Sequence, residues 1–159
     1  MSKVFDGRFT ARIDKPVVLF LIGLRINKPL ALGKWWPVAR AMPRMLAELD
    51  ARPGSGLLWH RTYVSLPVVM VQQYWDSFDN LLAYAHDKSA VHFPAWADFN
   101  RRVGGNGAVG IWHETYLVEP GKFETLYGNM PLFGLAVAGS HVKAEGRLAA
   151  AKDRFASVA

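Results

Sequence analysis

The sequence predicts an α+β fold with the order strand, helix, strand, strand, helix, strand. An unbroken apolar run at Val17 to Ile26 is typical of a central strand that is covered on both faces. Two segments of strand-like alternation lie on either side of Leu66-Pro67, and segments of helical spacing come before and after this pair. With 159 residues, of which 51% are hydrophobic, the chain has ample material for one core.

A helix is expected after the first strand, over Lys34 to Arg52, because apolar residues recur there at helical spacing. Pro43 falls inside this pattern and should kink the helix or split it in two. The turn residues of the segment 53–56 end it. Leu57 to Ser65 and Val68 to Trp75 are then expected to pair as antiparallel strands.

The second helix is expected at Phe78 to Asp87, capped by Asp76 or Ser77. Another helical segment should start near Phe93, since Pro94 is tolerated in a first turn, and end at the glycines of 104–107. Val109 to Val118 is the last main strand. This order is the ferredoxin-like βαββαβ arrangement.

The chain is expected to form a single domain over 1–159, with a core at about 17–118 and a C-terminal lid or extension at 119–159. Within the extension, Phe123 to Tyr127 is a candidate short strand. Lys143 to Ala159 is rich in alanine and charge, which favours a surface helix or a frayed tail.

Composition excludes several classes of function. The sequence has no cysteine, so disulfides, thiolate catalysis and Cys-ligated metals are excluded, and a reducing cytoplasm fits. The 19 basic residues are scattered, which gives no nucleic-acid module. No signal peptide is evident, and the apolar run from Pro16 to Leu24 is too short for a membrane span. No His or acidic spacing predicts a metal site, and no glycine-rich nucleotide motif is present.

His92, Trp96 and Asn100 form the first group of candidate site residues. Their spacing places them on one helix face, if the helix begins early enough to include His92. The indole can stack on a planar substrate while the imidazole and amide hydrogen-bond its oxygens, and the imidazole can instead take a proton or ligate haem iron. The structural alternative is that His92 is satisfied by backbone and Trp96 is core.

Trp112, Glu114 and Tyr116 form the second group, on one face of the last strand, with His113 on the other face. A carboxylate desolvated between two aromatic rings would have a raised pKa and can serve as a general acid or base. The alternative is a structural carboxylate that pairs with Arg61 or a backbone amide.

Asn129, Met130 and Phe133 form the third group, in the segment Tyr127-Gly128-Asn129-Met130-Pro131 and just after it. Glycine allows close backbone approach, and the Asn129 amide can donate and accept hydrogen bonds. The segment is expected to close over a cavity and to bind substrate. Packing against a second subunit is the alternative.

Three motifs carry a resemblance to a known family. They are His92-Phe93-Pro94-Ala95-Trp96-Ala97-Asp98-Phe99-Asn100-Arg101, then Gly110-Ile111-Trp112-His113-Glu114-Thr115-Tyr116, and then Tyr127-Gly128-Asn129-Met130-Pro131 with Phe133-Gly134-Leu135. Over about 17–154 the chain resembles a bacterial and fungal family grouped with the monooxygenase of the fumagillin pathway. That family is placed among the dimeric α/β barrels, with antibiotic-biosynthesis monooxygenases, chlorite dismutase-like haem proteins and aldoxime dehydratases.

The resemblance implies a ferredoxin-like protomer whose sheet pairs with that of a second copy, which leaves a cavity in each subunit of a homodimer. It implies a monooxygenase-like oxidoreductase that acts on a small hydrophobic or aromatic molecule. In this hypothesis His92 or Glu114 takes a proton, the carbanion reacts with O₂, and Asn100, Asn129 and Tyr116 orient oxygens.

Two alternatives remain open at this point. The protein can instead bind haem b through His92 as an aldoxime dehydratase-like lyase or an oxygenase, since some relatives hold haem through a histidine while others use no cofactor. It can also be a non-catalytic binder of small hydrophobic molecules, because a fold alone does not fix function.

Overall fold

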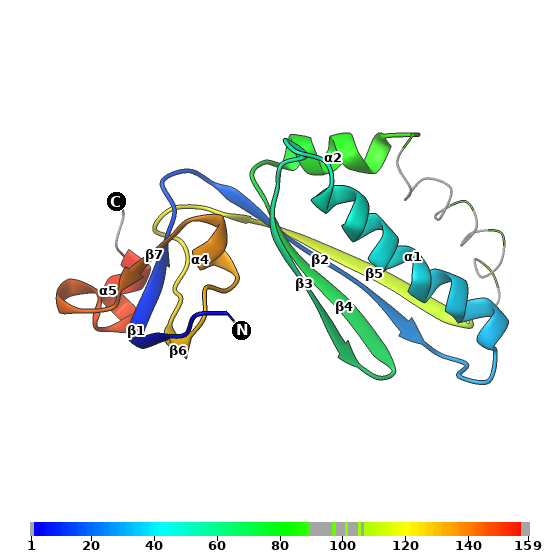
Figure 1. Cartoon of the computed structure of the whole chain (residues 1–159), viewed down its shortest axis with the longest axis horizontal. Coiled ribbons are helices and arrows are strands. Elements are labelled where there is room, and N and C mark those ends of the chain that lie inside the picture. The colour runs from blue at the N-terminus through cyan, green and yellow to red at the C-terminus, as the bar shows by residue number, and fades with distance from the viewer. Residues whose placement is uncertain (1, 90–96, 98–100, 102–104, 106, 157–159) are drawn as a thin grey trace.

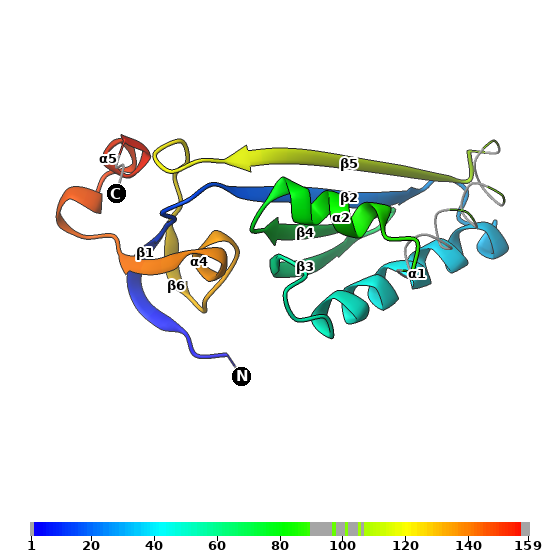
Figure 2. The same cartoon turned by 90° about the horizontal axis from the view of Figure 1, so that it is seen from above.

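Two antiparallel sheets, of four and three strands, lie side by side along the length of the molecule (Figure 1). This computed structural model describes residues 2–89, 97, 101, 105 and 107–156. Seen from above, helices α1 and α2 both lie over the same face of the four-stranded sheet (Figure 2). No helix in the described ranges is both long enough and apolar enough to cross a bilayer.

The larger sheet has the strand order β3-β4-β2-β5, with every neighbouring pair antiparallel. Its strands are β2 (Val17–Ile26), β3 (Leu57–Ser65), β4 (Val68–Trp75) and β5 (Val109–Val118). All four match the predicted bounds. With α1 after β2 and α2 after β4, the chain follows the ferredoxin-like βαββαβ order, so the predicted fold class is confirmed.

Helix α1 (Leu32–Asp50) is a single helix that contains both Pro37 and Pro43. The predicted split at Pro43 is therefore wrong: the helix continues because its inner face is fixed by packing on the sheet, with Leu46 and Leu49 buried. Helix α2 (Phe78–His86) begins as predicted.

Ser77 is the capping residue of α2. Its Oγ accepts a hydrogen bond of 3.2 Å from the Asn80 backbone N–H, which satisfies one of the free donors at the helix start.

The smaller sheet has the order β6-β1-β7, with strands β1 (Phe5–Arg12), β6 (Tyr127–Met130) and β7 (Ser140–Lys143). The sequence did not indicate β1 or β7, and the short strand expected at Phe123 to Tyr127 lies instead at β6. The four-residue strands β6 and β7 carry little local signal in the sequence. They form because they pair with β1, which lies more than a hundred residues away in the chain.

The C-terminal segment folds into short helices that are fixed to this sheet. They are α4 (Leu135–Ala138), a 3₁₀ turn at Gly146–Leu148 and α5 (Ala151–Ala156). Arg154 is only 7% exposed and its Nε donates to Glu124 at 2.6 Å. As far as residue 156, the segment is thus anchored by a part-buried ion pair.

One buried cluster joins the two sheets. It contains Ala11 from β1, Val17 and Tyr74 from the larger sheet, and Leu135 and Ala136 from α4. A second cluster, made of Val18, Leu49, Trp75 and Leu81, fixes α1 and α2 on the larger sheet. The extension therefore shares a core with the main sheet.

His141 predicts a pH dependence of stability. Its ring stacks on Phe9 at 4.2 Å, its buried Nε2 has no hydrogen-bond partner among the described residues, and burial lowers its pKa below 6.5. Because the folded protein binds this proton less readily than the unfolded chain does, protonation favours unfolding. The free energy of unfolding should therefore decrease as the pH falls below about 6.5.

We expect His141→Phe to reduce the loss of unfolding free energy between pH 7.5 and pH 5, measured by urea denaturation at several pH values. His86→Gln, at an exposed position of α2, is the control and should keep the wild-type pH slope. An unchanged slope in His141→Phe would contradict the assignment.

Candidate functional site

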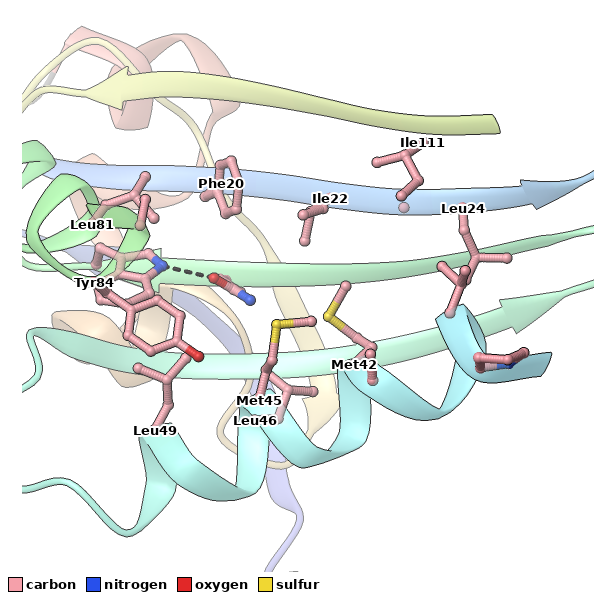
Figure 3. A pocket seen from close by; sticks show the side chains of 17 residues that line it. Phe20, Ile22, Leu24, Met42, Met45, Leu46, Leu49, Leu81, Tyr84 and Ile111 are labelled. Carbon is pink, nitrogen blue, oxygen red and sulfur yellow. Dashed lines mark hydrogen bonds between the residues drawn. The ribbon is translucent and has the colours of Figure 1, made fainter. Parts of the chain in front are cut away.

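An apolar cavity of about 220 Å³ lies between the helix-covered face of the larger sheet and helices α1 and α2. We call it the helix-side cavity; Figure 3 shows side chains of β2, β5, α1 and α2 converging on it. Its lining includes Phe20, Ile22, Leu24, Met42, Met45, Leu46, Leu81, Tyr84 and Ile111. A cavity of about 150 Å³ can hold a single aromatic ring in other proteins, so this one has room for one or two rings.

Strand register explains why these side chains share one face. Leu24 lies opposite Ile111 on β5, and Phe20 lies opposite Gln73 on β4. Because side chains alternate along a strand, the even residues of β2 and the odd residues of β4 and β5 point to the helices. The helical spacing of Met42, Met45 and Leu46 turns the same face of α1 toward them.

Three side chains in the lining carry polar atoms, namely Gln73, Trp75 and Tyr84. The Trp75 Nε1–H donates to Gln73 Oε1 at 2.8 Å, and the Tyr84 hydroxyl donates to Glu48 Oε2 at 3.3 Å. Burial, and then the neighbouring Glu48 carboxylate, raise the pKa of Tyr84, so its hydroxyl stays protonated. The described lining therefore contains no general base.

Trp112, Glu114 and Tyr116 lie on the other face of the larger sheet, which we call the helix-free face because α1 and α2 do not cover it; among the described helices, only the short helix α4 packs at one end, against Tyr74. They do not reach the helix-side cavity. A Cβ on Gly23 would lie 2.7 Å from Trp112 Nε1, so the indole rests on the glycine backbone of β2. The catalytic role of Glu114 and the substrate contacts of Trp112 and Tyr116 stay predictions, and they concern this face.

The Tyr116 hydroxyl donates to Glu114 Oε2 at 2.6 Å on this exposed surface. The hydrogen bond to the carboxylate is the largest cause of a raised pKa of Tyr116. Glu114 does not pair with Arg61, because Glu114 is on β5 and Arg61 is on β3, and these strands form opposite edges of the sheet. The Arg61 guanidinium lies 5.3 Å from the centre of the Phe133 ring instead.

Asn129, Met130 and Phe133 do not line the helix-side cavity either. Asn129, at a φ of 51°, accepts a hydrogen bond of 2.9 Å from the Gly7 backbone N–H through its Oδ1. Met130 pairs with Phe5 in the smaller sheet. Phe133 packs edge-on against Trp59 at 5.0 Å, on the helix-free side. Substrate binding by these residues stays a prediction, and their observed contacts fix the extension.

His92, Trp96 and Asn100 lie outside the described residues. Their proposed roles in proton transfer, stacking and haem ligation stay predictions. Within the described ranges, no three His, Cys, Asp or Glu side chains gather in a way that could hold a metal ion.

The sequence reasoning missed the cavity residues, and Gln73 above all. The inward positions of β4 are Val69, Val71, Gln73 and Trp75, so one amide interrupts an otherwise apolar row. This single polar residue in an apolar row was the signal in the sequence that could have indicated a binding site. It can be interpreted only once the structure shows that α1 and α2 cover this face of β4.

The strand order, the two helices on one sheet face and the cavity beneath them define a ferredoxin-like α+β fold with an apolar pocket. The profile of the family described as monooxygenase af470-like matches residues 17–135, which includes the whole larger sheet and both covering helices. The chain belongs to this family.

Monooxygenase af470 of Aspergillus fumigatus is 28% identical to this chain, and the aligned region covers 81% of the chain and 53% of that protein. The chain thus spans about half the length of this curated relative. Among solved structures, SnoaB, a cofactor-independent oxygenase from Streptomyces nogalater, has a TM-score of 0.46 at 11% identity and covers 65% of this chain and 93% of its own. The aldoxime dehydratase OxdRE in complex with butyraldoxime has a TM-score of 0.49 at 15% identity, with 81% and 40% covered.

Proposed function

We propose that the protein is an oxygenase that binds a small hydrophobic or aromatic substrate of one or two rings in the helix-side cavity. The observation that carries the proposal is the apolar lining of this cavity, in a chain that belongs to a monooxygenase-like family. Enclosed apolar pockets with a few polar groups are the usual sites for small molecules.

The reaction we propose inserts one oxygen atom into an electron-rich carbon of the substrate. A C–H proton is removed, the carbanion transfers electrons to O₂ and a C–O bond forms. A second C–H bond then breaks as the O–O bond is cleaved, so that a CH₂ group and O₂ give a carbonyl group and water. The substrate itself is the reductant, and no further electron donor is needed.

His92 is the base that we assign to this reaction, in preference to Glu114. Glu114 lies on the opposite face of the sheet, and Tyr84 has a raised pKa and stays protonated. Imidazole titrates near neutral pH, which suits proton transfer.

The described lining does not fit a haem. Its described residues include no lysine or arginine that could pair with the two propionates. The thioethers of Met42 and Met45 are the available soft donors, and the Tyr84 oxygen is engaged with Glu48. We therefore propose a cofactor-independent reaction; a Soret band after haem reconstitution, lost in His92→Ala, would contradict this.

Oxygen uptake tests the proposed function. The purified protein is mixed with a panel of one- and two-ring phenolic polyketides, and O₂ consumption is followed with an electrode. Ala41→Trp fills the cavity from α1 and should lower uptake about a hundredfold, because even small misplacement of a substrate is costly. Ala47→Trp, at an exposed position of the same helix, should keep the wild-type rate.

No uptake across the panel would contradict the oxygenase. Ligand-induced thermal stabilisation without uptake, lost in Ala41→Trp, would favour a non-catalytic binder.

We also propose that the helix-free face joins two copies into a homodimer. Leu19, Leu21, Met70 and Trp112 leave half-buried apolar surface there, which in a layered fold is normally covered by another layer. A stable interface of this kind would bury about 800 Å² on each copy.

Leu21→Arg, at the centre of this face, should convert the dimer to a monomer in sedimentation velocity at micromolar concentration. Val64→Arg is the control, because Val64 is 69% exposed and its register on β3 places it on the helix side. A wild-type monomer at this concentration, or an unchanged dimer in Leu21→Arg, would contradict the proposal.

A further inference from the structure

Gln73 is a buried amide whose oxygen and nitrogen can be assigned from its neighbour. Its side chain is on the cavity-lining face of β4 and the residue is only 5% exposed. The Trp75 Nε1–H is a donor only, so the atom 2.8 Å from it has to be the amide oxygen (the dashed line in Figure 3). The NH₂ group is then the branch that remains for other contacts.

Trp75 holds this amide in one orientation. The indole is fully buried and packs against Val18, Leu49 and Leu81, and its ring centre lies 6.0 Å from that of Tyr84. Because the Trp75 indole is packed in this way, it cannot move to keep the hydrogen bond if the Gln73 amide rotates. The amide therefore stays fixed by its hydrogen bond to the indole.

The Gln73 NH₂ group has no acceptor among the described residues. Its cross-strand neighbour His60 does not accept from it, because His60 Nε2 is 3.0 Å from Asp50 Oδ1 and His60 Nδ1 has no partner. This NH₂ group is therefore free to donate into the apolar cavity that Gln73 lines. The few polar groups of an apolar pocket are the ones that orient a bound molecule.

The lining also limits the charge of that molecule. None of the lining residues is Lys, Arg, His, Asp or Glu, so nothing in the described lining compensates a buried ionic group. We infer that the helix-side cavity binds a neutral, largely apolar one- or two-ring molecule whose carbonyl oxygen accepts a hydrogen bond from the Gln73 NH₂ group. This inference rests on the proposed substrate cavity, and it names the chemical class of the ligand.

The same contact has a role in the proposed reaction. When a proton leaves the carbon next to a carbonyl group, negative charge moves onto the carbonyl oxygen. A fixed N–H donor in an apolar site stabilises that oxygen without reorganisation. Gln73 then positions the ligand and also favours loss of the proton.

Binding of a matched ligand pair tests the inference without turnover. 1-Tetralone and tetralin share a two-ring skeleton and differ in one carbonyl group, and their affinities are measured by calorimetry under nitrogen. Wild type should bind 1-tetralone about tenfold more tightly than tetralin, as one buried hydrogen bond predicts. Gln73→Leu should remove this preference while keeping tetralin binding, and Ala47→Trp should keep both affinities.

The infrared carbonyl stretch of bound 1-tetralone provides a second readout on wild type, which needs no variant to fold. It should shift to lower frequency than in hexane. Equal binding of the two ligands, no binding of either, or an unshifted carbonyl band would overturn the inference.

Failure of the inference can be distinguished from failure of the oxygenase. Selective binding of 1-tetralone with no O₂ uptake on any phenol would remove the oxygenase and keep the role of Gln73. Uptake that is equal in wild type and Gln73→Leu, with no preference for 1-tetralone, would keep the oxygenase and remove the role of Gln73.

Discussion

Trp75→Ala should lower the free energy of unfolding by about 3–5 kcal/mol, the range for truncating a large buried aromatic side chain. Trp75 is 0% exposed and sits where β4, α1 and α2 meet, in a cluster with Val18, Leu49 and Leu81. Removing the ring leaves a hole in that cluster and also leaves Gln73 without its donor. In a domain of this size the midpoint of thermal unfolding should fall by roughly 6–20 °C.

The measurement is guanidinium denaturation followed by circular dichroism at fixed protein concentration, since association shifts apparent stability. Trp75→Phe keeps most of the packing but removes the N–H, and should lose about 1–2 kcal/mol. Trp36→Ala, at a position that is 53% exposed, should change stability by less than about 0.5 kcal/mol. A loss below about 1 kcal/mol in Trp75→Ala would show that this cluster does not hold the helices on the sheet.

Arg154→Met should lower the free energy of unfolding by about 2–3 kcal/mol. The Arg154 guanidinium donates to Glu124 Oε1 at 2.6 Å and to the carbonyl oxygens of Leu148 and Ala149 at 2.9 and 2.8 Å. Removing one partner of a buried pair costs about 3–5 kcal/mol, and we expect less here because the Glu124 side chain is 31% exposed.

The effect should be local to the C-terminal segment. Hydrogen exchange of the segment 146–156 should become faster in Arg154→Met and stay unchanged in Lys152→Met, which alters an exposed residue of the same helix. A double-mutant cycle with Glu124→Gln should give a coupling of about 1–3 kcal/mol. Coupling near zero would mean that the carbonyl contacts, and not the ion pair, anchor the segment.

The larger sheet could be predicted because its signals are local. The bounds of β2, β3, β4 and β5 follow from runs of apolar or alternating residues that lie between turn-forming residues such as Pro, Gly, Asn and Asp. The smaller sheet has no such signal. Strand β1 pairs with β6 and β7, which lie at the other end of the chain, and its register is set by packing on the shared cluster of Ala11, Val17 and Tyr74.

The candidate site depends more strongly on tertiary structure. The sequence by itself determined that His113 and Glu114 point to opposite faces of β5, because side chains alternate along any strand. It did not determine which of these faces the helices enclose, since β5 carries polar residues on both. Packing of α1 and α2 decides this: it places Gln73 beside Trp75 in the lining of the helix-side cavity and leaves Glu114 on the open face, because only one face of the sheet is covered by these helices.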